Sequence, residues 1–298
     1  MVSSHLPIRN NQLGAITMYE KGCEAMVTPT PPKLGMPAMI EVPQLEDNIR
    51  LACELGLDFV EINSNLPIYQ ARNMDVKHAQ ALLEQNNIFL TLHLDEYLHV
   101  TDLDPRVAEV YRIKLLEEIE RAKQLRIPVL NLHLLNGVHY TLPDKRVYVF
   151  DFYVGAFLQG IRDLRAMCEE AVGDSGIVLC IENLDGYCNV VVEAIDMLME
   201  SPVFGLTWDV GHDYRAHGQD ATWLKRHAKR VCHMHLHDAN VRSDHLALGT
   251  GEINISEKLR FIEACQGTCL VEVKTPESLR QSIAYLRALY QSTPKEDA

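Results

Sequence analysis

The sequence predicts an α/β protein built as an eight-stranded (β/α)8 barrel, a TIM barrel. Two observations predict it. First, short continuous apolar runs, expected of parallel strands buried on both faces, alternate with segments of helical spacing along most of the chain. Second, eight strand–helix units in about 280 residues match the usual size of this barrel. An open doubly wound sheet is the competing fold, but it would not bring the ends of its strands together around one axis.

The expected strands are the apolar runs, taken in order along the chain. They are 13–19, 58–64, 88–94, 129–134, 177–183, 204–211, 231–239 and 269–274, of which the first is a poor strand. Two connections exceed the usual loop length, 20–43 and 135–150, and we expect both to lie over the mouth of the barrel.

The expected helices fill the gaps between these strands. They are 45–56, 75–87, 105–125, 151–172, 190–200, 220–228, 256–265 and a last helix to about 291. Asp104 and Pro105 form the cap and first turn of the third helix. That helix carries five apolar residues at core spacing, namely Val107, Val110, Leu115, Ile119 and Ala122.

The composition is that of an ordinary globular protein, with 47% apolar and 23% charged residues. No apolar run approaches a membrane span, and the start shows no secretory signal. The 8 cysteines are scattered without a CxxC pair, so we expect a cytoplasmic protein. A net charge of −13 disfavours DNA as a partner. We expect one domain over 1–298, with loose tails at 1–12 and 292–298, and the oligomeric state stays open.

Residues of metal-ligand type lie at or just past the ends of six successive apolar runs. They are His93, His133, Glu182, Asp209, His212, His235, His245 and Glu272. A buried strand that ends in an unpaired carboxylate or imidazole is costly unless something binds it. The carboxyl ends of barrel strands converge on one site. The pattern therefore predicts an enzyme that uses divalent metal ions.

Five motifs give a family resemblance over about 180 residues. They are IEN at 181–183, WDVGH at 208–212, MHLHDA at 234–239, HLALGTGEI at 245–253 and VEV at 271–273. They resemble the xylose-isomerase-like TIM-barrel superfamily, which includes sugar phosphate isomerases and epimerases and the endonuclease IV-like enzymes (AP endonuclease family 2). The resemblance implies a shared ligand set of Glu182, Asp209, His235 and Glu272. Such a set suits Zn²⁺ or Mn²⁺, with Mg²⁺ and Co²⁺ as alternatives.

One reading of the resemblance is a phosphodiesterase-type hydrolase with one to three ions. In endonuclease IV-like enzymes, imidazoles at the positions of His93 and His133 complete one site, and Glu182 would bridge two ions. His212 and His245 would belong to a third site, where Ser243 stands in place of the expected aspartate and Asp244 comes one place late. Clustered ions favour displacement at a phosphodiester. A small phosphodiester, such as a cobamide, is the expected substrate.

The alternative is a sugar or sugar-phosphate isomerase or epimerase with one metal ion. Glu182 and Glu272 would then be the catalytic acid–base pair. In this reading His93, His133 and His212 contact a phosphorylated or polyhydroxylated substrate, and His245 braces its loop. A non-catalytic barrel is a third, weaker reading, because ligand types stand at every expected strand end.

Other residues are expected around the site. Glu61 either contacts substrate or forms a buried ion pair, while Lys145 and Arg146 either clasp an anionic substrate or lie in a solvated loop. Support behind the ligands is expected from His233, Asp238 and Asp244. Asp238 would orient a ligand imidazole or tie its loop.

Overall fold

Eight parallel strands close into a barrel in the computed structural model, which describes residues 31–184 and 186–292. The order around the barrel is β1-β2-β3-β4-β7-β8-β9-β10, and β10 pairs with β1. The strands are β1 (Leu34–Pro37), β2 (Phe59–Asn63), β3 (Phe89–His93), β4 (Val129–His133), β7 (Val178–Glu182), β8 (Phe204–Asp209), β9 (Val231–Leu236) and β10 (Thr268–Val271). The TIM-barrel fold predicted from the sequence is confirmed.

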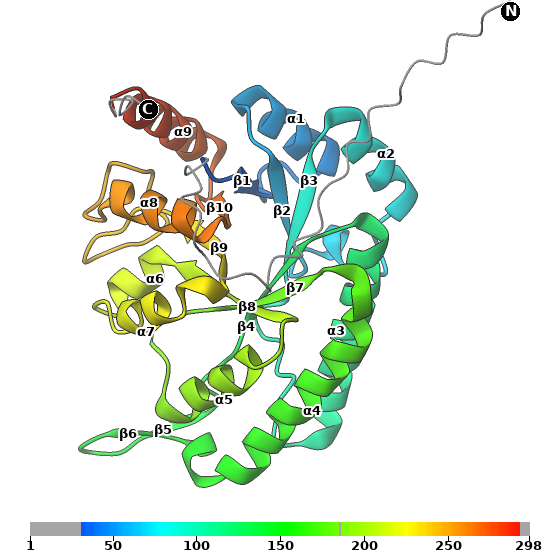
Figure 1. Cartoon of the computed structure of the whole chain (residues 1–298), viewed down its shortest axis with the longest axis vertical. Coiled ribbons are helices and arrows are strands. Elements are labelled where there is room, and N and C mark those ends of the chain that lie inside the picture. Colours follow the sequence, from blue (N-terminus) through cyan, green and yellow to red (C-terminus); the bar gives the residue numbers. More distant parts are fainter. Residues whose placement is uncertain (1–30, 185, 293–298) are drawn as a thin grey trace, which may run out of the picture.

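Helices surround the strands, as Figure 1 shows. The α-helices are α1 (Leu45–Leu55), α2 (Val76–Asn86), α3 (Pro105–Leu125), α4 (Val154–Val172), α5 (Asn189–Met199), α6 (Val210–Arg215), α7 (Ala221–Arg226), α8 (Ile255–Cys265) and α9 (Pro276–Ser292). The short 3-10 turns are η1 (Pro67–Tyr69), η2 (Val149–Phe152), η3 (Gly173–Ser175) and η4 (Ala228–Arg230). Among the described residues no helix is long and apolar enough to cross a membrane.

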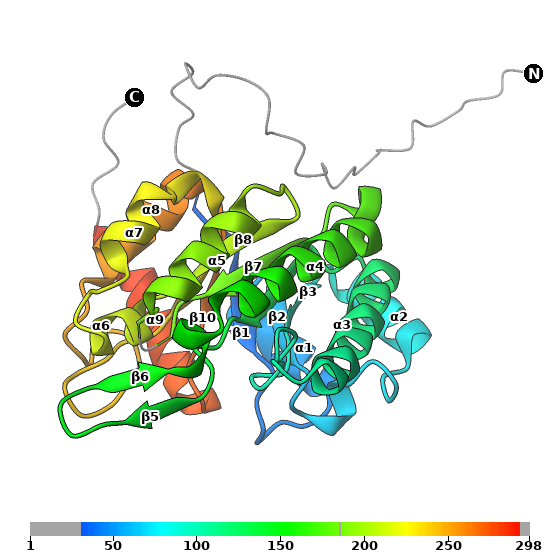
Figure 2. The ribbon, with the colours of Figure 1, turned by 90° about the horizontal axis from the view of Figure 1, so that it is seen from below.

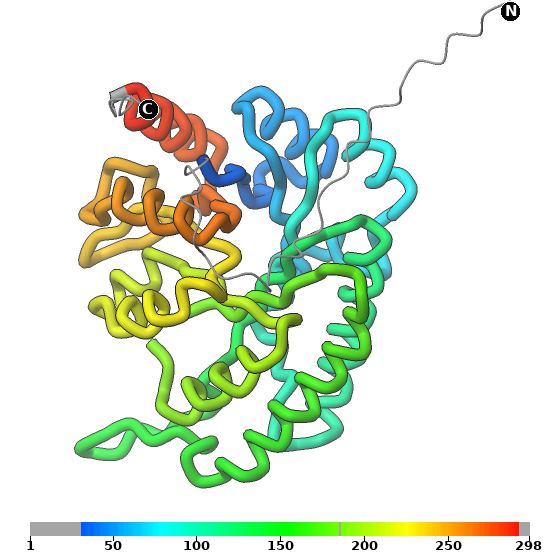
Figure 3. Tube along the Cα trace, in the orientation of Figure 1, coloured from blue at the N-terminus to red at the C-terminus, as the bar shows by residue number. Residues whose placement is uncertain are grey.

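The first barrel strand differs from the predicted one. The segment expected at 13–19 lies outside the described residues, and β1 comes from the connection expected at 20–43. The strand is only 4 residues long and contains Gly35, where an added Cβ would lie 2.2 Å from the Phe59 ring. A glycine therefore lets β1 pass close to β2. Figure 3 shows the blue start of the described chain beside its red end, where β1 pairs with β10.

The other long connection, expected as a loop at 135–150, contains an antiparallel hairpin of β5 (His139–Thr141) and β6 (Arg146–Tyr148). It leaves the carboxyl end of β4, and Figure 2 shows it protruding from the barrel wall. The predicted tails lie outside the described residues, apart from Ser292, which ends α9.

Burial of apolar side chains between strands and helices forms the core. Trp208 on β8 has no exposed surface and meets Phe261 of α8 edge to face at 4.7 Å between ring centroids. On α3 the predicted core face is partly wrong. Leu115, Ile119 and Ala122 are buried, but Val107 and Val110 are 40% and 66% exposed, because they lie on the outer side of the helix.

The register of the strands sets side chains of the predicted site next to one another. His133 of β4 pairs with Glu182 of β7, and Asp209 of β8 pairs with His235 of β9. An irregularity between Leu206 and Thr207 shifts the β8–β9 register just before this second pair. Paired residues of neighbouring parallel strands point to the same face, so all four side chains are directed into the barrel.

Candidate metal centre at the carboxyl end of the barrel

Three carboxylates converge on one imidazole nitrogen. Nδ1 of His235 lies 3.4 Å from Oε1 of Glu182, 3.1 Å from Oε2 of Glu272 and 3.8 Å from Oδ2 of Asp209. Glu182 and Asp209 are the last residues of β7 and β8, and Glu272 directly follows β10. The ends of four strands therefore supply three carboxylates and one imidazole to a single point.

This donor set fits a divalent cation. His235 has no exposed surface, and neither of its ring nitrogens has a hydrogen-bond partner among the described residues. A buried polar atom without a partner is costly, and three carboxylates around it add repulsion of like charges. Oxygen-rich ligation with one imidazole suits Mn²⁺, Mg²⁺, Co²⁺ or Zn²⁺.

The carboxylates of this group are held ionised. Burial opposes the charge of Glu182, but His235 and His133 outweigh it and hold the pKa of the carboxyl well below its usual range. Burial likewise opposes the charge of Glu272, and His235 lowers the pKa of that carboxyl well below its usual range. Both groups are therefore in the form that binds a cation.

A second group forms around the other oxygen of Glu182. Its Oε2 lies 3.1 Å from Nε2 of His133 and 3.5 Å from Nε2 of His93, and it accepts a hydrogen bond from Asn131. Nδ1 of His93 donates to the carbonyl oxygen of Leu94 at 2.7 Å, so Nε2 faces Glu182. A backbone carbonyl behind the ring is typical of a histidine that binds a metal.

A proton competes for the second group. Burial lowers the pKa of His93, but the hydrogen bond and charge of Glu182 outweigh it and raise the pKa to about 9. An ion that binds between His93, His133 and Glu182 must displace this proton. The affinity of this group for a metal should therefore rise with pH.

His212 and His245 also reach the centre. Nδ1 of His212 lies 3.5 Å from Oε1 of Glu182, and Nε2 of His245 lies 3.5 Å from Oε1 of Glu272. Asp244 does not take the place of the aspartate expected at Ser243. Its carboxylate is 3.1 Å from Nδ1 of His245 and 3.1 Å from Arg215, so it lies behind the imidazole and orients it.

Glu61 and His233 lie beneath His235, inside the barrel. Oε1 of Glu61 is 3.3 Å from Nε2 of His235, and Oε2 is 3.2 Å from Nε2 of His233. Thr91 donates a hydrogen bond to the same carboxylate at 2.8 Å. Glu61 is only 3% exposed, so these contacts fit the buried ion pair better than the expected substrate contact.

Asp238 binds the backbone of the loop after β9 and does not orient a ligand imidazole. Its carboxylate accepts hydrogen bonds from the backbone N–H groups of Ala239, Gly249, Gly251 and Ile253 at 2.8 to 3.0 Å. The charge of one buried carboxylate thereby organises the turn that follows His245.

Lys145 and Arg146 are not brought to the centre. Both are exposed on the β5–β6 hairpin, and no hydrogen bond or ion pair joins either side chain to the described site residues. The placement fits the alternative of a solvated loop. The anionic clasp stays a prediction.

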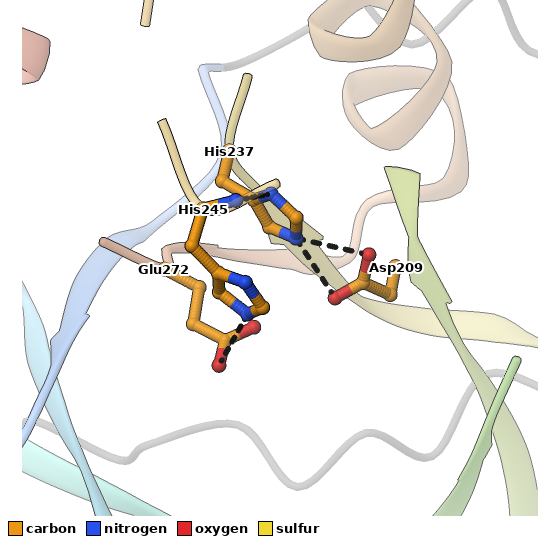
Figure 4. Close-up of side chains that lie close together, drawn as sticks. All are labelled: Asp209, His237, His245 and Glu272. Carbon is orange, nitrogen blue, oxygen red and sulfur yellow. Dashed lines mark hydrogen bonds and ion pairs between the residues drawn. The ribbon is translucent and has the colours of Figure 1, made fainter. Parts of the chain in front are cut away.

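The sequence reasoning missed three functional candidates. Asn131 donates to Glu182, and Nζ of Lys274 lies 2.7 Å from Oε1 of Glu272. His237 lies 3.0 Å from Asp209 and is part of the group in Figure 4. Lys274 follows Glu272 by two residues, a spacing that could have indicated a contact. The place of Asn131, two residues before His133 on a strand, was a similar signal.

The fold and the cluster define a class, namely barrels with metal-ligand side chains at the carboxyl ends of their strands. A sequence profile described as "Xylose isomerase-like TIM barrel" matches residues 49–289. The chain belongs to this xylose isomerase-like TIM-barrel family. No curated protein matches the sequence.

Solved structures of sugar epimerases have a similar fold. A D-tagatose 3-epimerase-like protein is 21% identical, with a TM-score of 0.68 over 87% of this chain and 97% of that one. The 3-keto-D-glucoside 4-epimerase from E. coli is 16% identical, with a TM-score of 0.69 over 86% and 99% of the two chains. The D-allulose 3-epimerase from Methylomonas sp., in complex with D-allulose, is 15% identical, with a TM-score of 0.66 over 91% and 100%. At these identities the likeness is one of fold.

Proposed function

We propose that the protein is a divalent-metal-dependent isomerase or epimerase of a small, sugar-like substrate. One observation carries the proposal: Glu182 and Glu272 approach the same nitrogen of His235 to 3.4 and 3.1 Å. Two carboxylates around one buried point can take a proton from a substrate carbon and return one to it. The similar structures named for epimerases of D-tagatose, 3-keto-D-glucoside and D-allulose support this reading over the hydrolase.

Both glutamates are ionised in the free protein, so the chemistry requires that one of them gains a proton from solvent when the substrate binds. The ionised carboxylate accepts the proton of the carbon beside a carbonyl, and the electron pair of the broken C–H bond moves into that carbonyl. The protonated carboxylate then gives its proton to the opposite face of the carbon, which inverts its configuration. Lys274 holds Oε1 of Glu272, so Oε2 is left facing His235.

A divalent ion held by Glu182, Asp209, His235 and Glu272 would polarise the carbonyl and hydroxyl oxygens of the substrate. Oδ1 of Asp209 accepts the backbone N–H of His212 at 2.7 Å, and Oδ2 lies 3.8 Å from Nδ1 of His235. His212 is partly exposed beside Glu182 and can bind a substrate hydroxyl.

Exchange of a carbon-bound proton with solvent tests this proposal. The Mn²⁺-loaded protein is incubated in D₂O with ketohexoses and their phosphates, and deuterium beside the carbonyl is followed by NMR. We expect incorporation that falls by about 100-fold or more in Glu182→Gln and Glu272→Gln. Glu257→Gln, on the exposed side of α8, is the matched control. No incorporation in any sugar, or full rates in both site variants, would contradict the proposal.

A second candidate is hydrolysis of a small phosphodiester. One observation favours it: His93, His133 and Glu182 each offer a ligand atom, and these three atoms lie within 4.8 Å of one another. A second ion would need such a group. A proton-transfer enzyme with one ion has no need of this group as ligands. Two ions that share Glu182 could activate water and neutralise the leaving oxygen.

Metal counting separates the two candidates. If the protein is a hydrolase, it should contain two or more ions per chain, and His93→Ala should lose one ion together with cleavage of bis(p-nitrophenyl) phosphate. If it is an isomerase, it should contain one ion, and His93→Ala should retain it. The content is measured by inductively coupled plasma mass spectrometry on protein purified without chelators.

A further inference from the structure

The group in Figure 4 has the composition of a metal site, but hydrogen bonds hold its residues together. Asp209, His237, His245 and Glu272 each offer a ligand atom within 4.8 Å of the others. Whether His237 can be a ligand depends on which of its nitrogens carries the proton, because a metal binds the nitrogen that has a free lone pair. Its hydrogen bonds decide this.

The backbone fixes the tautomer of His237. Nδ1 of His237 accepts the backbone N–H of His245 at 2.8 Å, whereas the carbonyl oxygen of Asp238 lies at 3.4 Å. A nitrogen that accepts a hydrogen bond carries no proton, so the proton of the neutral ring is on Nε2. Nε2 lies 3.0 and 3.1 Å from the two oxygens of Asp209 and donates to that carboxylate. No lone pair of His237 is left for a metal.

The ring of His237 cannot swing away from this position. It is fully buried, and the ring of His245 stacks on it at 4.1 Å and 6°. Near the same ring lies Gly211, where an added Cβ would come within 1.9 Å of Cε1 of His237. The backbone of His245 has φ of 53°, a left-handed conformation that costs a non-glycine residue of order 1 kcal/mol. That conformation accompanies the hydrogen bond from the amide of His245 to His237.

We propose that His237 is a positioning residue, which holds Asp209 for the metal centre and is not itself a ligand. This inference rests on the metal centre of the proposed function. Oδ1 of Asp209 accepts the backbone N–H of His212 at 2.7 Å, and Nε2 of His237 lies 3.0 Å from Oδ1 and 3.1 Å from Oδ2. These donors fix the plane of the carboxylate with Oδ2 3.8 Å from Nδ1 of His235. Loss of the donor frees the carboxylate to rotate and lowers the affinity for the ion.

Two amide variants separate the roles of the two ring nitrogens. In His237→Asn the amide lies near the place of Nδ1, so it can accept from His245 but cannot reach Asp209. In His237→Gln the amide reaches the place of Nε2 and can donate to Asp209. We expect the Kd for Co²⁺ to rise about 10- to 100-fold in His237→Asn and to stay within about threefold in His237→Gln.

The readout is Co²⁺ titration of the metal-free protein, followed by the visible absorption of the bound ion. The absorption bands should shift in His237→Asn and be restored in His237→Gln. The control His78→Asn, an exposed histidine of α2, should leave both readouts unchanged. Thermal unfolding of the metal-free variants checks that each one folds.

The outcomes that overturn the inference differ from those that overturn the proposed function. Wild-type protein that binds no Co²⁺, Mn²⁺ or Zn²⁺ would overturn both. Wild-type protein that binds Co²⁺, with His237→Asn binding it equally well, would overturn the inference alone. An equal loss in the two variants would also overturn it, because the ring would then act only by packing. If His237→Asn does not fold, a loss beyond tenfold in folded His237→Gln contradicts the inference.

Discussion

At the scale of single residues, Glu182 serves two groups of histidines at once. Oε1 faces His235 and His212, and Oε2 faces His133 and His93. Because each oxygen meets a different pair of imidazoles, the carboxylate can hold one ion or bridge two. The proton on His93 competes with a second ion, so protonation of His93 bears on the number of ions that Glu182 can hold.

The contact between Gly211 and His237 predicts a strong effect of one methyl group. In Gly211→Ala the new Cβ would lie 1.9 Å from Cε1 of His237, so the ring or α6 must move. We expect a loss of about 1–3 kcal/mol in the free energy of unfolding, together with weaker metal binding. Gly155→Ala on α4, where nothing lies within 4 Å of the new Cβ, is the control and should not destabilise. Denaturant unfolding that shows equal stability for both variants would refute the close contact.

Asp220 gives a prediction for stability against pH. Burial, aided by the charge of Asp213, raises the pKa of Asp220 to about 6, and Oδ2 has no hydrogen-bond partner among the described residues. The folded state therefore binds the proton more tightly than the unfolded state. The stability from this group is complete below about pH 4 and is lost as pH rises through about 6.

Asp220→Asn should remove this loss. We expect the variant to be more stable than wild type by about 1–2 kcal/mol at pH 7.5 and nearly equal to it at pH 4. Urea unfolding at both pH values measures the difference, with Asp163→Asn on the exposed side of α4 as the control. If the variant is no more stable than wild type at pH 7.5, ionisation of Asp220 does not destabilise the folded state.

At the scale of elements, the strands that were predictable are the ones with continuous apolar runs. β7 and β8 carry VLCIE and FGLTWD, which bury both faces and read as parallel strands. β1 was missed because LGMP is short and contains glycine and proline, and because its fit depends on contact with Phe59 of β2. Val107 and Val110 were misplaced because apolar spacing alone does not show which face of a helix another helix covers.

The hydrogen bonds of Asp238 are expected to stabilise the loop after β9. In Asp238→Ala four backbone N–H groups lose their acceptor, including those of Gly249, Gly251 and Ile253. We expect destabilisation of about 2 kcal/mol or more and faster amide exchange over 246–253. Hydrogen–deuterium exchange with mass spectrometry measures it, with Asp244→Ala as the comparison, since Asp244 binds side chains instead. Unchanged exchange in Asp238→Ala would show that other contacts hold the loop.

At the scale of the whole molecule, the barrel explains why the ligand set was predictable and its support was not. Glu182, Asp209 and His235 stand at strand ends, and the parallel barrel brings such ends together whatever the loops do. The role of His237 depends on one backbone amide in a loop, and the burial of Glu61 depends on packing inside the barrel. Neither follows from spacing along the chain.

The whole fold should respond to metal because the centre joins four strands. Metal-free protein holds ionised Glu182, Asp209 and Glu272 close together, so a divalent ion that binds only the folded state stabilises it. With the ion at 100 times its Kd, the gain is about 2.7 kcal/mol, which corresponds to a rise in Tm of several degrees. Scanning calorimetry with EDTA and with excess Mn²⁺, Co²⁺ or Zn²⁺ measures the shift. Asp209→Asn should abolish most of the shift, because the variant loses one of the three carboxylate charges. A wild-type Tm that no metal moves would contradict a metal centre at the end of these strands.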